Sequence, residues 1–256
     1  FYASTRRLTE VSYRPNDLTQ YSTDDLRALE YELQADILRE KQASAFWDFE
    51  PKPFQQPWWD CKKPIIGLLC GNQTGKTTYG VMRMLIACTG VKPKFLGGNP
   101  NDGFPEGICK GKRYLAAGEE FEVVRKETIV PKLTESVTDE MLDGPPSIPA
   151  TGGIVYRFRS GAELKIKSYK QHRKSFEGSV YNGAWLDEPP VEDIWTAVRR
   201  GLVANAGWIV LSATSLDEIW TYDQILEPAE DDTPPRHAMV AKFEAVMHDN
   251  CADCHG

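Results

Sequence analysis

The N-terminal part of the chain places hydrophobic residues at helical intervals. Four Leu or Ile residues between positions 26 and 37 recur every three or four residues among charged neighbours, which puts them on one face of a helix. Residues 22–25 have the spacing of a capping box, a common start of a helix. We therefore predict an amphipathic helix from this point to about Gln42.

Beyond this helix the pattern becomes irregular and then strand-like. Residues 46–64 mix aromatic side chains with prolines, which predicts an ordered loop. The apolar run 65–70 is short enough for a buried parallel strand. A helix is predicted over 77–89, because Gly90 stands where a glycine often ends a helix. Residues 91–111 are rich in Gly, Pro, Asn and Lys and are predicted to form a surface excursion.

The second half of the chain continues to alternate between strand and helix patterns. On both sides of a Ser-Gly turn, apolar and basic residues alternate within residues 154–167, which predicts a hairpin with one apolar and one basic face. This order favours an α/β fold with a mostly parallel central sheet flanked by helices and an added antiparallel hairpin. The other predicted strands are 113–117, 184–186 and 208–213, and the other predicted helices are 119–130 and 191–200.

Composition and charge exclude several classes of protein. No apolar run approaches the roughly 18 residues of a membrane-spanning helix, and no secretory signal follows Phe1. The net charge of −7 argues against a surface uniformly coated for nucleic acid, so any contact with DNA has to be local. Six scattered cysteines predict free thiols in a reducing compartment. We therefore expect a fragment of a cytoplasmic protein that has no membrane partner.

A Gly-rich loop lies between the strand predicted at 65–70 and the helix that follows it. Backbone N–H groups in such a loop, next to a helix N-terminus, bind phosphate oxygens. Lys76 is predicted to reach the β and γ phosphates of ATP, and Thr77 to hold Mg²⁺. Cys70 stands where the common pattern has its first glycine. The predicted ATP-binding residues are Gly71, Asn72, Gln73, Thr74, Gly75, Lys76, Thr77 and Thr78.

An acidic pair follows the strand predicted at 184–186. Because a strand-end Asp beside Mg²⁺ is the second half of this chemistry, Asp187 is predicted to hold the metal directly or through water. Glu188 is predicted to orient and deprotonate the attacking water as general base. The next strand ends in small hydroxyl residues that can sense the γ-phosphate, namely Ser212, Ala213 and Thr214. Three such elements in one order favour a translocase or helicase ATPase.

These motifs resemble the ATPase domain of the large terminase subunit, the motor that packages DNA into the heads of tailed phages. The resemblance covers most of residues 22–250 and rests on residues 71–77, on the Trp-Leu-Asp-Glu-Pro-Pro run at 185–190 and on residues 212–214. It implies a P-loop NTPase of the ASCE/RecA-like class. It also implies that Ser212, Ala213 and Thr214 couple hydrolysis to movement.

The same resemblance implies cofactors, partners and a place in the cell. The cofactors are ATP and Mg²⁺, and the partners are double-stranded DNA, the portal protein of an empty capsid, a small terminase subunit and a homo-oligomeric ring. The location is the host cytoplasm and, transiently, the portal vertex. A nuclease domain is expected after the motor, so the chain is interpreted as a fragment that carries the motor only. Its expected parts are an N-terminal helical lead-in (1–45), the P-loop ATPase core (46–230) and the start of a lid or linker (231–256).

The resemblance also implies adenine contacts and a charge-stabilising arginine. Gln56 and Trp58 lie where terminases and helicases place adenine contacts, although packing within the loop explains them as well. Asn72 takes the place of an arginine that many terminases carry in the phosphate loop. An arginine finger therefore has to come from elsewhere, with Arg173 as first candidate and Arg125 as second. A solvated basic segment without a role in the reaction explains each of them as well.

Cations gather on the predicted hairpin. One face of a hairpin with alternating cations suits sequence-independent contact with DNA phosphates. A solvated face or a contact with a neighbouring subunit explains the pattern equally well. The predicted DNA-contacting residues are Arg157, Arg159, Lys165 and Lys167.

A Cys-x-x-Cys-His run near the C-terminus has the spacing of c-type haem attachment. Haem is rejected because that attachment needs export and a surrounding haem fold. A zinc site is the other interpretation, but the position at the end of the chain favours an incidental arrangement. The residues concerned are His248, Cys251, Cys254 and His255.

Two alternatives of other classes stay open at this point. The first is a helicase or remodelling ATPase that acts on nucleic acid without a capsid, and the absence of later helicase motifs counts against it. The second is a nucleotide-binding regulatory module without turnover, and the intact Glu188 counts against that.

Overall fold

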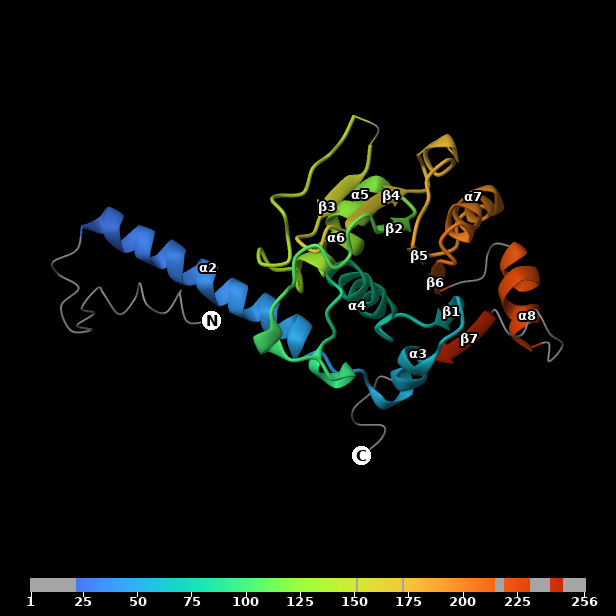
Figure 1. Ribbon diagram of the computed structural model, residues 1–256, viewed down its shortest axis with the longest axis horizontal. Helices are drawn as coiled ribbons and strands as arrows, with labels where there is room; N and C mark the ends of the chain where they lie inside the picture. Colours follow the sequence, from blue (N-terminus) through green and yellow to red (C-terminus); the bar gives the residue numbers. More distant parts are fainter. Residues whose placement is uncertain (1–21, 151, 172, 215–218, 231–239, 246–256) are drawn as a thin grey trace. The chain divides into compact units, whose positions relative to one another are not determined.

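The computed structural model describes residues 22–150, 152–171, 173–214, 219–230 and 240–245 (Figure 1). The chain divides into two compact units, residues 1–40 and 41–256. Within the described residues, no helix combines the length and the apolarity that crossing a membrane requires.

The predicted N-terminal helix is α2 (Thr23–Trp47). Its capping box is confirmed, because the N–H groups of Ser22 and Asp25 each donate to the other residue's side chain at 3.2 Å. The helix continues five residues beyond the predicted end at Gln42. Phe46 and Trp47, in that extension, are buried against each other, which stabilises the last turn.

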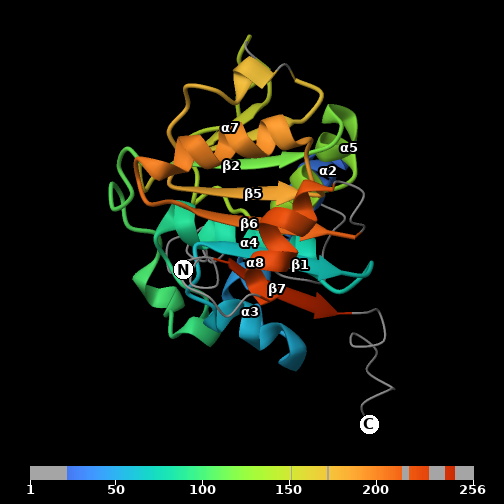
Figure 2. The same cartoon turned by 90° about the vertical axis from the view of Figure 1, so that its right-hand side faces the viewer.

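A seven-stranded sheet forms the centre of the second unit, in the order β3-β4-β2-β5-β6-β1-β7. Figure 2 shows the successive strands β2, β5, β6, β1 and β7 of this order. Neighbouring strands pair in parallel except β3 and β4, which form the predicted hairpin. The predicted α/β fold with a hairpin addition is confirmed. The strands are β1 (Ile65–Cys70), β2 (Arg113–Gly118), β3 (Ile154–Arg157), β4 (Glu163–Ser168), β5 (Gly183–Asp187), β6 (Trp208–Ala213) and β7 (Val240–Ala245).

Helices cover both faces of this sheet. α4 (Lys76–Thr89), α5 (Phe121–Lys126) and α6 (Ile129–Thr134) pack on one face, and α7 (Glu192–Val203) packs on the other. Successive residues of a strand point to opposite faces, so Trp185 packs under α4 and Leu186 under α7. Gly80 allows α4 to lie close, because a Cβ there would be 2.1 Å from the Trp185 ring.

β6 lies between β1 and β5 in the sheet. The strand that leads into the Gly-rich loop is therefore not the neighbour of the strand that ends in the acidic pair. Register places Leu69 beside Ala213, and Asp187 beside Ser212. Since parallel strands end at the same edge of a sheet, the three predicted motifs meet there.

Several predicted boundaries were wrong. The helix predicted over 119–130 is two short helices, because Thr128 between them leaves helical geometry at φ −116° and ψ −91°. The loop predicted over 46–64 contains the end of α2 and two short helices, η2 (Pro53–Gln55) and α3 (Gln56–Asp60). The segment predicted as a lid or linker contributes β7, which pairs with β1 at the edge of the sheet.

The remaining short helices lie in connections. In the predicted surface excursion, Phe95 and Phe104 pack against the core, so this segment is partly buried. The short helices are η3 (Lys94–Leu96), η4 (Pro100–Asp102), η5 (Arg173–Ser175), η6 (Tyr222–Leu226) and α8 (Glu227–Glu230).

Candidate active site

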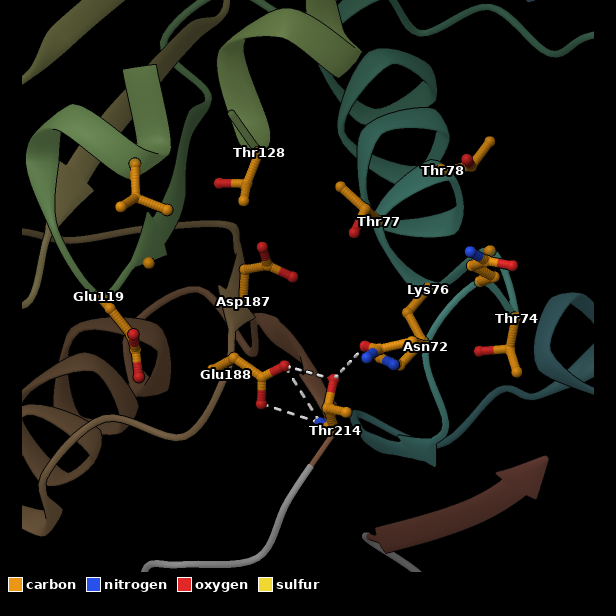
Figure 3. A pocket seen from close by; sticks show the side chains of 14 residues that line it. Asn72, Thr74, Lys76, Thr77, Thr78, Glu119, Thr128, Asp187, Glu188 and Thr214 are labelled. Carbon is orange, nitrogen blue, oxygen red and sulfur yellow. Dashed lines mark hydrogen bonds between the residues drawn. The ribbon is translucent and has the colours of Figure 1, made fainter. Parts of the chain in front are cut away.

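A cavity of about 500 Å³ lies at the carboxyl ends of β1, β2 and β5 (Figure 3). It brings together the Gly-rich loop, the acidic pair and the hydroxyl motif. The first and the last of these motifs are more than 100 residues apart in the sequence. It is lined by residues 72–78, Gly118, Glu119, Val123, Thr128, Asp187, Glu188 and Thr214.

The Gly-rich loop is held by its own side chains. Thr74 is buried and its hydroxyl donates to the Gly71 carbonyl at 2.8 Å. Lys76 Nζ donates to the carbonyls of Cys70 at 2.5 Å and Gly71 at 2.8 Å. Burial lowers the pKa of Lys76, and the nearby Glu188 carboxylate partly opposes this. The ammonium group thus lies at the mouth of a preformed loop beside a carboxylate.

Gln55, which the sequence did not single out, supports the loop from behind. Its Nε2 donates to the Thr74 carbonyl at 2.7 Å, and its Oε1 accepts the Lys52 N–H at 2.9 Å. Gly75 has φ 87°, and a Cβ there would lie 2.5 Å from Gln55 Nε2. The loop therefore needs glycine at this position both for its backbone angle and for the approach of Gln55.

The predicted adenine contacts lie elsewhere. Trp58 is buried in the core, where its ring packs edge-on against Tyr79 and its carbonyl accepts the Tyr79 hydroxyl at 2.9 Å. Gln56 is exposed and donates to Asp60 at 3.1 Å. Neither residue lines the cavity. The prediction is wrong for Trp58, because the aromatic cluster under α4 uses its ring for packing.

Asp187 is the buried acid of the pair. Its Oδ1 accepts the Ser212 hydroxyl at 2.9 Å, and Ser212 in turn accepts Trp185 Nε1 at 3.0 Å. Burial raises the pKa of Asp187 to about 6, the hydrogen bond from Ser212 opposes this, and the Glu188 carboxylate adds to it. The β6 hydroxyl therefore orients the carboxylate of β5.

Glu188 adopts an unusual backbone conformation, with φ 66°. Its N–H donates to the Ser212 carbonyl at 2.7 Å. Its carboxylate accepts both the N–H of Thr214, at 2.8 Å, and the Thr214 hydroxyl, at 2.7 Å (Figure 3). Thr214 Oγ1 also lies 3.4 Å from Asn72 Oδ1. All three motifs are thus joined by direct contacts.

Two further lining residues come from the β2 side of the cavity. Glu119 follows directly on β2, and its charge contributes to the raised pKa of Asp187. Glu119 could have been predicted from the sequence, because it is an acidic residue at the end of an apolar strand, as Asp187 is. Thr128, in the break between α5 and α6, carried no signal in the sequence.

Oxygen ligands suited to Mg²⁺ face the cavity. Thr77 and Asp187 offer a hydroxyl and a carboxylate, and Mg²⁺ is commonly held by one or two carboxylates, substrate phosphates and water. No group of three or more His, Cys, Asp or Glu residues in the described ranges could hold a metal by itself. Thr77 and Asp187 are the side chains of the cavity that fit Mg²⁺ by their chemistry. The predicted zinc ligands, His248, Cys251, Cys254 and His255, lie outside the described residues.

No arginine lines the cavity within the part of the chain that the structure describes. Arg173 pairs with Glu177 at 2.8 Å and with Asp193 at 3.1 Å. Arg125 pairs with Glu122 at 3.1 Å. Both arginines thus have acidic partners outside the cavity.

The hairpin does not present four cations on one exposed face. Lys167 is buried, because its Nζ donates to the Ser175 carbonyl and lies over the Phe176 ring. Burial lowers the pKa of Lys167 to about 8. The prediction of Lys167 as an exposed DNA contact is therefore wrong. Of the others, Lys165 is half-buried, Arg157 pairs with Glu163 at 3.5 Å, and Arg159 donates to the Leu142 carbonyl at 3.0 Å.

Comparison with known families decides to which family the chain belongs. The family described as "Terminase large subunit, T4likevirus-type, N-terminal" matches residues 68–253. The chain belongs to this family. The resemblance inferred from the motifs is confirmed, and this large terminase domain is an ATP hydrolase of DNA packaging.

Solved structures of large terminases share the fold. The ATPase domain of Thermus phage P74-26 is 15% identical, with a TM-score of 0.51 over 79% of this chain and 83% of that one. The large terminase of a second, thermophilic bacteriophage is 13% identical, with a TM-score of 0.54 over 84% of this chain and 47% of that one. Another structure of that second terminase is a complex with ADP. No curated protein matches the sequence.

Proposed function

We propose that this terminase domain hydrolyses ATP in the cavity between the Gly-rich loop and the acidic pair, and thereby moves double-stranded DNA into an empty capsid. The observation that carries the proposal is the convergence of Lys76, Asp187 and Glu188 on one cavity, with Glu188 hydrogen-bonded to Thr214. The phosphate group and the attacking water would lie between these side chains.

The Gly-rich loop binds the triphosphate in this proposal. Lys76 Nζ exchanges the carbonyls of Cys70 and Gly71 for β and γ phosphate oxygens, so the preformed loop keeps its shape while the ammonium turns outward. Thr77 and Asp187 hold Mg²⁺, which when bound neutralises charge that develops on the phosphates. The ADP complex of the thermophilic phage terminase, which shares the fold, supports nucleotide binding by this domain.

Glu188 acts as the general base. Its carboxylate borders the cavity, so it can accept a proton from water that attacks the γ-phosphate. Taking up that proton would neutralise the carboxylate and weaken its hydrogen bonds from the N–H and hydroxyl of Thr214. Hydrolysis would therefore alter the end of β6, which supports a coupling role for Ser212, Ala213 and Thr214.

The assembly completes the site. Because the described part of the chain supplies no arginine to its own cavity, a neighbouring subunit in a ring would supply one, with Arg173 as first candidate and Arg125 as second. The ring would sit on the portal protein and receive DNA from a small terminase subunit. Its place would be the host cytoplasm and, during packaging, the portal vertex. Arg157, Arg159 and Lys165 remain proposed phosphate contacts.

The test measures ATP hydrolysis and ATP binding for Lys76→Ala and Glu188→Ala, with and without DNA and portal-bearing capsids. We expect Lys76→Ala to lose binding. Glu188→Ala should retain binding while turnover falls by about 100-fold or more, because general-base catalysis contributes on that order. Glu106→Ala, at an exposed glutamate outside the cavity, is the matched control. Full turnover in Glu188→Ala would remove the assignment of the base.

A further inference from the structure

We propose that Tyr169 is a positioning residue for the hydrolysis step, and that its hydroxyl holds the backbone of Glu188 in the conformation from which the carboxylate works. The inference rests on the proposed role of Glu188 as general base. It assigns to Tyr169 a role in catalysis but no contact with the nucleotide.

Tyr169 lies where three strand ends meet. It directly follows β4, and its N–H donates to the Gly118 carbonyl at the end of β2. Its hydroxyl donates to the Glu188 carbonyl at 2.8 Å, and the carbonyls of Ala117 and Asp187 lie at 3.1 and 3.4 Å. A hydroxyl has one proton, so the shortest contact, to Glu188, is the principal bond. The side chain thus ties β4 to the turn after β5, across β2.

That turn needs an external partner. Glu188 has φ 66°, a backbone region that residues with a Cβ rarely adopt. Pro189 and Pro190 follow and have no N–H to donate, so they cannot close the turn with backbone bonds of their own. Two described bonds hold the Glu188 peptide groups, the N–H to the Ser212 carbonyl and the carbonyl to the Tyr169 hydroxyl.

The backbone angle decides where the carboxylate goes. The positive φ directs the Glu188 side chain to Thr214 and the cavity, and a return to negative φ would turn its Cβ away. Tyr169 itself does not line the cavity, and the Gly-rich loop does not depend on it. Loss of the hydroxyl should therefore slow hydrolysis and leave nucleotide binding intact. The phenol stays protonated, since burial and the carboxylates of Asp187 and Glu188 raise the pKa of Tyr169 well above its ordinary value.

The first experiment compares Tyr169→Phe with the unaltered 256-residue chain. We expect kcat for ATP to fall about tenfold, the effect of losing one well-placed hydrogen bond, while KM and the Kd for ADP change less than about twofold. Tyr114→Phe is the control, because Tyr114 is buried in β2 and its hydroxyl makes no hydrogen bond within the described residues. An unchanged kcat in Tyr169→Phe overturns the inference. Parallel loss of ADP binding, or a preparation that does not bind ADP, also overturns it by indicating a merely structural role.

A double-mutant cycle separates this inference from the proposed function. If Tyr169 acts through Glu188, single-turnover hydrolysis by Tyr169→Phe/Glu188→Gln will be no slower than by Glu188→Gln alone. If the two substitutions instead slow hydrolysis by the product of their separate effects, Tyr169 acts independently of Glu188. That result would overturn the inference, while the role of Glu188 would stand. Full activity in Glu188→Gln would instead overturn the proposed function and the inference with it.

Discussion

At the scale of single residues, the burial of the Asp187 carboxyl opposes folding. In the unfolded chain its carboxyl loses a proton near its ordinary pKa of 3.8, whereas burial raises the pKa in the folded chain to about 6. Between these values the folded state binds more protons, so its stability falls as the pH rises. Above about pH 6 the full cost applies, about 3 kcal/mol from a shift of this size. The proposed Mg²⁺ site would account for such a residue.

Asp187→Asn should therefore make the protein more stable and abolish ATP hydrolysis. At about pH 8 in EDTA we expect its free energy of unfolding to exceed that of the unaltered chain by up to about 3 kcal/mol, because the buried charge is gone and the Ser212 bond remains. The gain should shrink as the pH falls from about 6 toward about 4. Urea denaturation at a series of pH values measures this. ATP hydrolysis should be lost.

The matched control for that experiment is Asp139→Asn, since Asp139 is exposed and lies outside the cavity. This variant should change neither stability nor hydrolysis. Equal stability of Asp187→Asn and the unaltered chain in the alkaline measurement would contradict the account of Asp187 as a destabilising buried acid.

At the scale of elements, the segment that contains η2 and α3 supports the Gly-rich loop through one side chain, that of Gln55. Gln55 is buried and its amide spans from Lys52 to the Thr74 carbonyl. Its neighbour Gln56 faces solvent. Because a helical turn rotates successive side chains by about 100°, adjacent glutamines have opposite roles here.

Gln55→Ala should raise the KM for ATP about tenfold at nearly unchanged kcat. It leaves the Thr74 carbonyl without its partner, at a cost of about 1–3 kcal/mol, and loosens the loop before the nucleotide binds. Steady-state kinetics and ADP titration measure the effect. Gln56→Ala serves as control and should behave like the unaltered chain. A larger effect of Gln56→Ala than of Gln55→Ala would restore the original prediction for Gln56.

At the scale of the whole molecule, the proposed reaction would draw a second cation from outside the described lining of the cavity. Lys76 is the basic residue among its described lining residues, and an arginine finger typically contributes about 10³-fold or more. The exposed pairs of Arg173 with Glu177 and Asp193 contribute little to stability, so Arg173 is free to change partners in an assembly.

Arg173→Ala should lower turnover on portal-bearing capsids by on the order of 10³-fold, with ATP binding intact. Mixing it with Lys76→Ala should restore part of the activity, because one subunit keeps the loop and the other keeps the arginine. Hydrolysis by the mixture compared with each variant alone is the measurement. The same mixture made with Arg125→Ala tests the second candidate. Unreduced turnover in Arg173→Ala would exclude it as the finger.

The sequence by itself determined the features whose signal is contiguous. The residues of the Gly-rich loop are consecutive, and its preceding strand and following helix are decided by local spacing and by glycine. The acidic pair and the hydroxyl motif are equally local. Resemblance to large terminases could be inferred from these runs, and the family comparison confirmed it.

Only the tertiary structure decided which side chains of distant elements meet. Pairing of β1 with β7, which joins Ile65 to Val240, placed the predicted lid in the sheet. The inward turn of Lys167, the choice of Gln55 over Gln56 and the bond from Tyr169 to Glu188 likewise depend on neighbours outside the local sequence pattern. The physical reason is that hydrogen bonding and burial act between atoms in contact, and strand order brings those atoms together.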